Sequence, residues 1–144
     1  MPDPVDAITF LKEENATKGN NQGLQIWLYS WSADYPDPQN WTTLQFGKDA
    51  VGNYMNYGQN TTSDALQEQA IQQQLEQADV EADSAARLLL YQSAEQQLIN
   101  QVAWMPLFQA TSSIVQKPYV KGIVHNGLGL IPPSDWASIY ISEH

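Results

Sequence analysis

DSAARLLLYQSAEQQLINQVA, residues 83–103, is the stretch of this sequence that decides its fold. Its apolar side chains recur at the spacing of one helix face, and they include Leu90, Ala94, Leu98 and Val102. Asp83 is a residue type favoured immediately before a helix. The pattern predicts a helix over residues 83–103 that buries those apolar side chains and leaves Arg87 and Glu95 for exposed pairing.

The preceding residues predict a second helix. Ser63 or Asp64 can cap a helix over residues 64–77. Its apolar face is expected to comprise Leu66, Ala70, Ile71 and Leu75. The glutamine-rich remainder is typical of a solvated face. Because only the turn at residues 79–83 separates the two helices, we expect them to pack as an antiparallel pair.

The residues before the helix pair predict a strand, a turn and a loop. Residues 24–31 are aromatic, aliphatic and β-branched with few polar interruptions, which predicts a central strand covered on both faces. Two prolines within residues 35–38 cannot continue that strand, so the chain must turn there. Residues 39–46 predict a short helix, and residues 47–62 predict a surface loop that nevertheless carries Tyr54 and Tyr57.

Shorter strands are expected after the helix pair. Residues 105–110 and 113–115 have strand composition, with Pro106 at a strand start or edge. Pro132 and Pro133 disfavour helix, and residues 136–141 predict a last short strand. The sequence therefore predicts an α/β (mixed α+β) fold in a single domain over residues 1–144, with a small mixed sheet and a helix pair packed against it.

Composition excludes several functions. The 144 residues carry 16 acidic and 6 basic side chains, a formal charge of −10, which repels nucleic acid and anionic membranes. Without cysteine and with only His125 and His144, a cysteine-based or multi-histidine metal centre is not expected, and no cofactor is predicted. No apolar run is long enough to cross a bilayer, and residues 1–4 lack the features of an export signal.

The motifs of common enzymes are also missing from the sequence. No glycine-rich phosphate loop and no serine-nucleophile motif occurs, so no catalytic residues are assigned. Paired carboxylates leave one enzymatic alternative, an acid/base hydrolase that uses Asp34 and Asp37. Asp37 lies between prolines, where aspartate commonly accepts backbone N–H groups, and we interpret it as a turn former or helix cap.

Asp34 and Trp31 are the candidates for ligand contact. A carboxylate at the end of a strand can pair with a cation, and an indole beside it can cover an apolar or cationic group. Ligand contact and local capping explain Asp34 equally well from spacing alone. Trp27 and Trp41 are assigned to core packing.

An ordered set of motifs resembles the family 5 solute-binding proteins of peptide-type ABC importers. Residues 34–38, DYPDP, resemble the family's D-x-x-D-P turn, and residues 87–98, RLLLYQSAEQQL, resemble its R-x-x-L-Y-x-x-A-E-x-x-L helix. The remaining matches, in chain order, are the strand at 23–31 that ends in tryptophan, Asn53-Tyr54 before Asp64-Ala65-Leu66, and residues 105–109, 118–122 and 136–141.

The resemblance implies a role and a set of site residues. In the peptide-binding members the aspartate of the W-x-x-D stretch pairs with the ligand's α-ammonium, which corresponds to Asp34. The neighbouring tryptophan lines a side-chain pocket, which corresponds to Trp31, and Ser32 would offer backbone hydrogen bonds. The family also includes nickel, oligosaccharide and antibiotic-peptide binders, so the ligand stays open between a peptide and another small solute.

The resemblance also implies a setting. The chain matches only the C-terminal part of such receptors, which have two lobes, a periplasmic-binding-protein-like type II fold and a membrane permease as partner. An extracellular or periplasmic location is implied, with anchoring through an N-terminal region outside these residues. Apolar surface that meets an absent lobe could lead to self-association. Besides the hydrolase, the remaining alternative is an intracellular interaction domain built on the glutamine-rich helix pair.

Overall fold

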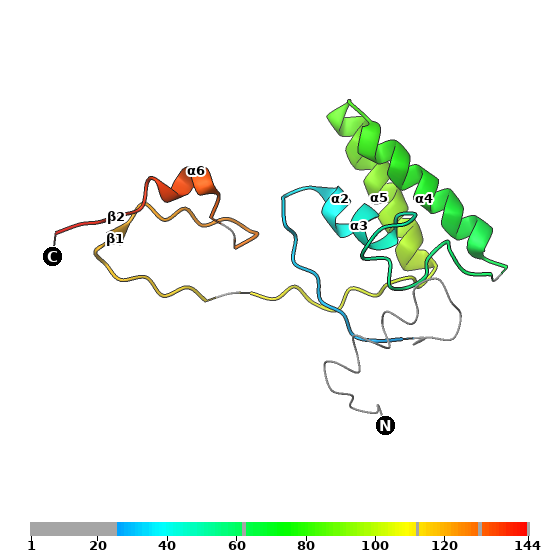
Figure 1. The fold of residues 1–144 in the computed structure, drawn as a ribbon, viewed down its shortest axis with the longest axis horizontal. Coiled ribbons are helices and arrows are strands. Elements are labelled where there is room, and N and C mark those ends of the chain that lie inside the picture. The colour runs from blue at the N-terminus through cyan, green and yellow to red at the C-terminus, as the bar shows by residue number, and fades with distance from the viewer. Residues whose placement is uncertain (1–25, 62, 112, 130, 144) are drawn as a thin grey trace, which may run out of the picture. The chain divides into compact units, whose positions relative to one another are not determined.

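Two helices pack side by side in the computed structural model, which describes residues 26–61, 63–111, 113–129 and 131–143 (Figure 1). The first, α4, spans Ala65–Val80, and the second, α5, spans Ser84–Asn100. The Asp83 side chain accepts a hydrogen bond from the Ala86 N–H at 2.8 Å and so caps α5. The predicted pair and its connecting turn are confirmed, with bounds shifted by up to three residues.

The end of α5 differs from the prediction. The Ala103 N–H donates to the Leu98 carbonyl at 2.9 Å and the Val102 N–H to the Ile99 carbonyl at 3.0 Å, the two bonds of a Schellman motif. Val102 therefore takes a left-handed conformation, with φ of 58°. This turn ends the helix before residue 103 and leaves Val102 76% exposed, so its predicted burial is wrong.

The buried face of α4 is also rotated from the predicted one. Ile71, Leu75 and Ala78 are buried, whereas Leu66 is 77% exposed and Ala70 is exposed. At 100° per residue, Leu66 lies about 140° around the helix from Ile71, so the two cannot share a narrow face. The core of the first unit combines residues of α4, α5 and the preceding segments, namely Phe46, Tyr57, Ile71, Leu75, Ala78, Tyr91, Ala94 and Leu98.

Two single helical turns precede the pair. They are α2, Pro38–Trp41, and α3, Thr43–Phe46, and they confirm the short helix predicted for residues 39–46. Pro38 occupies the first turn of α2, as expected for a residue whose missing N–H would be unpaired there anyway. Trp41 is 37% exposed, so its assignment to the core is wrong, and Trp27 is only partly buried.

Side-chain amides hold the loop at residues 47–61 against α4. The buried Gln72 amide donates to the carbonyls of Phe46 and Tyr57, at 2.9 and 2.7 Å. Asn53 is fully buried, and its side chain bonds both the N–H and the carbonyl of Tyr57. These bonds satisfy backbone groups that a buried loop would otherwise leave unpaired. Tyr57 itself packs edge-on against Phe46 in the core, so the loop predicted to lie at the surface is partly buried there.

The predicted central strand is not found in its described part. Residues 26–31 form no strand pairing, and Ile26 and Leu28 are 85% and 72% exposed. A strand forms only when a neighbour supplies hydrogen bonds, and a sequence pattern cannot supply that neighbour. Residues 24–25 lie outside the described residues.

The chain divides into two units, and the second begins at Pro106. In this unit β1, Val120–Lys121, pairs antiparallel with β2, Tyr140–Ile141, with Val120 opposite Ile141. Helix α6, Pro133–Trp136, uses Pro133 in its first turn, so the expectation that these prolines disfavour helix is wrong. The predicted last strand is confirmed only for its final two residues.

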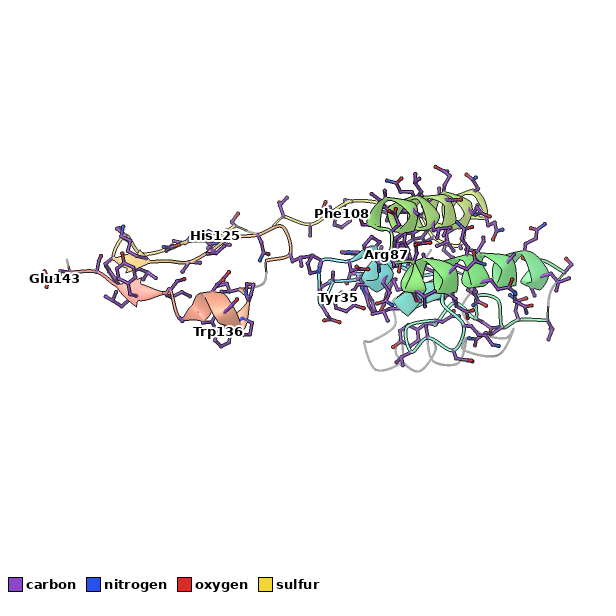
Figure 2. All side chains as sticks on the ribbon, turned by 90° about the horizontal axis from the view of Figure 1, so that it is seen from above. Tyr35, Arg87, Phe108, His125, Trp136 and Glu143 are labelled. Atoms are coloured by element: carbon purple, nitrogen blue, oxygen red, sulfur yellow. The ribbon has the colours of Figure 1, made fainter. Side chains whose placement is uncertain are left out.

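The strands predicted for residues 105–110 and 113–115 are also wrong. These residues are in no strand, and Figure 2 shows Phe108 on an extended stretch without helix. Together, a packed helix pair and a two-stranded sheet confirm the mixed α/β class. None of the helices in the described ranges has the length and apolarity needed to cross a membrane.

Candidate functional site

The candidate ligand residues belong to one short segment, residues 31–34. The Trp31 indole N–H donates to the Asn40 side-chain oxygen of α2 at 2.8 Å. The Trp31 ring also packs against Tyr29, with ring centroids 6.1 Å apart. Trp31 is partly exposed, so its indole is fixed by α2 while part of its surface stays open to solvent.

Asp34 presents a free carboxylate. Ala33, immediately before it, is buried, whereas Ser32 and Asp34 are exposed. Within the described part of the chain, no hydrogen bond or ion pair engages the Asp34 side chain. The structure therefore does not support the capping interpretation that the sequence left open for this residue.

Asp37, three residues later, is fully engaged. Its Oδ1 accepts the Gln39 N–H at 2.9 Å and so caps α2. The two guanidinium nitrogens of Arg87 donate to its Oδ1 and Oδ2 at 2.8 and 2.9 Å, a bidentate ion pair across fifty residues of sequence. The interpretation of Asp37 as a structural cap is confirmed.

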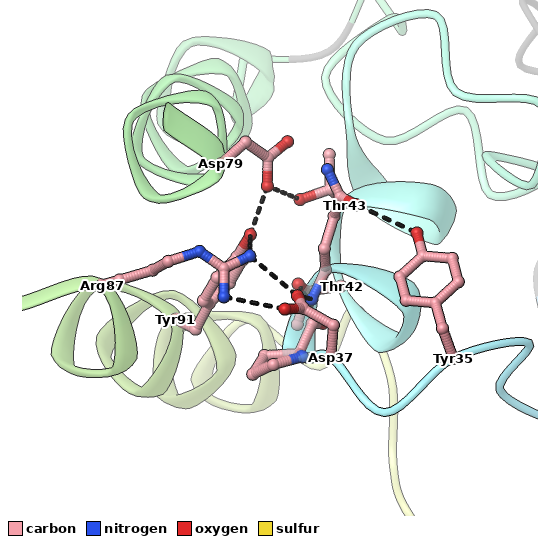
Figure 3. Close-up of polar contacts among 9 residues, drawn as sticks. Tyr35, Asp37, Thr42, Thr43, Asp79, Arg87 and Tyr91 are labelled. Atoms are coloured by element: carbon pink, nitrogen blue, oxygen red, sulfur yellow. Dashed lines mark hydrogen bonds and ion pairs between the residues drawn. The ribbon is translucent and has the colours of Figure 1, made fainter. Parts of the chain in front are cut away.

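A polar network extends from this ion pair through the helices (Figure 3). Arg87 Nη2 also donates to the Tyr91 hydroxyl at 3.1 Å, and its guanidinium lies 4.8 Å from the Tyr91 ring centroid. The Tyr91 hydroxyl donates to Asp79 of α4, which also accepts the Thr43 hydroxyl at 3.0 Å. One connected network thus joins α2, α3, α4 and α5.

The electrostatics of the network follow from these contacts. The hydrogen bonds from Arg87 lower the pKa of Asp37, against an opposing effect of burial. Burial raises the pKa of Tyr91, and its bond to Asp79 raises it further. Both oxygens of the Asp37 carboxylate are engaged by Arg87 and the α2 backbone, so neither is free to take part in proton transfer, which argues against the hydrolase alternative for Asp37.

Acid titration should expose the Asp37 pair. A carboxyl whose folded pKa is lowered stabilises the fold above its unfolded pKa, about 3.9, and loses that contribution as the pH falls through the folded value. We expect Asp37→Asn to be destabilising at pH 7, with a deficit that shrinks as the pH falls from about 4 to 2. Urea unfolding at each pH measures the difference, and a deficit that is constant with pH would contradict the lowered pKa.

Sequence reasoning missed most of this network. It expected Arg87 in exposed pairing and did not connect it to Asp37, and it assigned no role to Tyr91, Asp79 or Asn40. One local signal was present, because Arg87 and Tyr91 are four residues apart on a helix and so are neighbours. The partners on other elements leave no such signal.

Other surfaces do not add to the site. A groove along α4 and α5 is lined by residues that include Gln74, Leu89 and Leu90, and none of residues 31–34 lines it. His125 is exposed in the second unit. Over the described ranges, no three acidic or histidine side chains come together as a metal site would require.

Comparisons with known proteins give one curated relative. No family model matches the chain, and no solved structure matches it. The chain is 29% identical over 126 residues to heme-binding protein A of Haemophilus influenzae, which covers 87% of this chain and 22% of the relative. The chain thus spans about a fifth of the relative's length. The similarity to a binding protein agrees with a function other than catalysis, and it supports the resemblance to solute-binding proteins at a coarse level.

Proposed function

We propose that this chain is the C-terminal part of a two-lobed solute-binding protein that captures oligopeptides or related solutes for an ABC importer. Support comes from the ordered motifs at residues 34–38 and 87–98 and from the similarity to a protein named for binding heme. The protein would act outside the membrane, in an extracellular or periplasmic location, and present its ligand to a permease. Anchoring through a further N-terminal region is part of the same proposal.

The observation that carries the proposal is the contrast between two aspartates. Asp37 has both carboxylate oxygens engaged by Arg87 and the α2 backbone. Asp34 is exposed and unpaired among the described residues, and it follows the partly exposed Trp31 by three residues. A negative charge and an aromatic surface on one short segment suit the α-ammonium and first side chain of a peptide. Ser32 is exposed and offers its backbone to the same ligand.

The chemistry favours a cationic ligand group at Asp34. The relative's name makes heme a second candidate ligand, yet the propionate groups of heme are anionic and would be repelled by this carboxylate and by a chain of net charge −10. The ammonium group of a peptide is attracted by the Asp34 carboxylate and by the negative charge of the chain. We therefore place peptides first and keep heme as the alternative that the experiment must include.

An exposed charge pair alone gives weak binding. A charge-assisted hydrogen bond contributes about 1.5–3 kcal/mol, and exposure to water reduces that further. Closure of a second lobe would exclude water and strengthen the bond. We therefore expect the 144-residue chain alone to bind peptides weakly or not at all, and the full-length protein to bind them tightly.

Calorimetry tests the proposal with three ligands. A peptide with a free amino terminus, the same peptide N-acetylated, and ferric heme are each titrated into the full-length protein and into the 144-residue chain. In the full-length protein, we expect the free-amine peptide to bind more tightly than the N-acetylated peptide. Equal affinity for both peptides would contradict the ammonium site, and tight binding of heme alone would replace the peptide by heme as ligand.

Self-association is a further part of the proposal. Large apolar side chains in the second unit are exposed, among them Leu107, Phe108, Ile114 and Val115. Exposed apolar surface of this kind favours association unless another part of the protein covers it. Gel filtration at several concentrations should show an apparent mass that rises with concentration for the 144-residue chain, and a constant monomer mass would contradict this.

A further inference from the structure

We propose that Arg87 is a positioning residue for the 31–34 segment, which it holds in place through Asp37 and α2. This inference rests on the proposed function, because the segment matters for ligands only if Asp34 and Trp31 contact them. Arg87 itself is not expected to touch the ligand, since both ends of its guanidinium fork are occupied by Asp37 and Tyr91.

The first step is that α2 needs an external attachment. The helix has four residues, a single turn, and so short a helix is not stable by itself in water. Its N-terminal cap, Asp37, is the residue that Arg87 of α5 binds through both guanidinium nitrogens. The ion pair therefore joins the beginning of α2 directly to the long helix that forms half of the packed pair.

The second step is that both fixed points of the segment belong to α2 and its cap. Trp31, at the start of the segment, is bonded to Asn40, which is fully buried in α2. After the segment, the Asp37 N–H donates to the Tyr35 carbonyl at 2.9 Å and closes the turn. Asp34 lies between these two attachment points. A shift of α2 would therefore move both attachment points and Asp34 with them.

The third step is that the position requires arginine. Arg87 is the sole arginine in the sequence, and it uses the planar fork that matches a carboxylate bidentately. Its guanidinium also lies over the Tyr91 ring and donates to the Tyr91 hydroxyl. A lysine ammonium would keep the charge but could not fix the orientation of the Asp37 carboxylate in the same way.

The test uses two perturbing variants, one conservative variant and a charge control. Arg87→Met removes the pair, Asp37→Asn removes its charge while keeping an oxygen that can cap α2, and Arg87→Lys keeps the charge. Lys48→Met is the control, because it also removes one positive charge but its exposed side chain takes part in none of the network contacts. Circular dichroism checks that the helix pair stays folded in each variant.

Two measurements are compared. NMR order parameters of residues 31–34 in the 144-residue chain report whether the segment is held, with values near 0.85 for rigid backbone and below about 0.6 for flexible backbone. The ratio of affinities for the free-amine and N-acetylated peptides in the full-length protein reports whether Asp34 still faces its ligand. A purely structural role of Arg87 would lower stability without changing that ratio.

For Arg87→Met and Asp37→Asn, we expect both the order parameters and the affinity ratio to fall. Order parameters should fall in the segment but not in α4 or α5, and the affinity ratio should fall at least fivefold, with Arg87→Lys intermediate and Lys48→Met unchanged. Unchanged order parameters, or a ratio that responds to Asp34→Asn but not to Arg87→Met, would overturn the positioning role and leave the proposed function intact. A mobile segment with no ammonium preference in the wild type would instead refute the proposed function, and with it any ligand role for Arg87.

Discussion

Replacing Asp34 by asparagine in the full-length protein is expected to weaken binding of free-amine peptides by about 10- to 150-fold. The variant keeps the size of the side chain but removes the charge, so it removes a charge-assisted bond of about 1.5–3 kcal/mol. N-acetylated peptides have no ammonium to lose, and their affinity should change less than about threefold. Calorimetric titration of both peptides measures the two changes in the same buffer.

A matched control separates the site from general electrostatics. Glu76→Gln removes one negative charge from the exposed face of α4, where the described contacts give it no partner. Because salt screens an exposed charge that makes no direct contact with the ligand, this variant should bind both peptides as the wild type does. If Asp34→Asn weakened both peptides equally, Asp34 would not be the ammonium site.

Replacing Phe46 by alanine is expected to have the largest effect on stability, about 3–5 kcal/mol. Phe46 is completely buried, and the rings of Tyr57 and Trp104 pack edge-on against it at centroid distances of 5.5 and 5.3 Å. Truncation would leave a cavity at the point where α3 and the loop at residues 47–61 meet α4. Urea unfolding followed by the helical circular dichroism signal measures the loss.

Phe108→Ala is the matched control for that experiment. Phe108 is 81% exposed, so truncation removes the same atoms without opening a cavity. Its effect should stay within about 0.5 kcal/mol. A cost for Phe46→Ala no larger than that for Phe108→Ala would mean that the core is not built as described.

The helix pair could be predicted because its determinants are local. Asp83 caps α5 as expected, and Leu98 and Ala94 are buried at the spacing that the pattern requires. Val102 continues the same spacing yet is exposed, because a Schellman turn ends the helix before it. No apolar pattern encodes that turn, and a β-branched residue in a left-handed conformation is a choice that propensities would not favour.

The strands could not be predicted in the same way, because a strand depends on a partner that is often distant in sequence. Residues 26–31 have strand composition but no pairing among the described residues, while the two short strands that do form involve Val120 and Ile141. The candidate site likewise has one feature that could be predicted from local sequence and one that could not. Asp37 as a cap could be predicted from the prolines on either side of it, whereas its pairing with Arg87 spans fifty positions and depends on the fold.

The pH dependence of the two peptide affinities tests the central claim most directly, because it needs no mutation. An α-ammonium loses its proton near pH 7.7–8.0 in water, and binding to a carboxylate raises that pKa, so the attraction is complete below about pH 7 and is lost as the pH rises above about 9. The affinity ratio of free-amine to N-acetylated peptide should therefore be high at about pH 6.5 and fall toward one at about pH 9.5. A ratio near one across the whole range would contradict a carboxylate reserved for a cationic ligand.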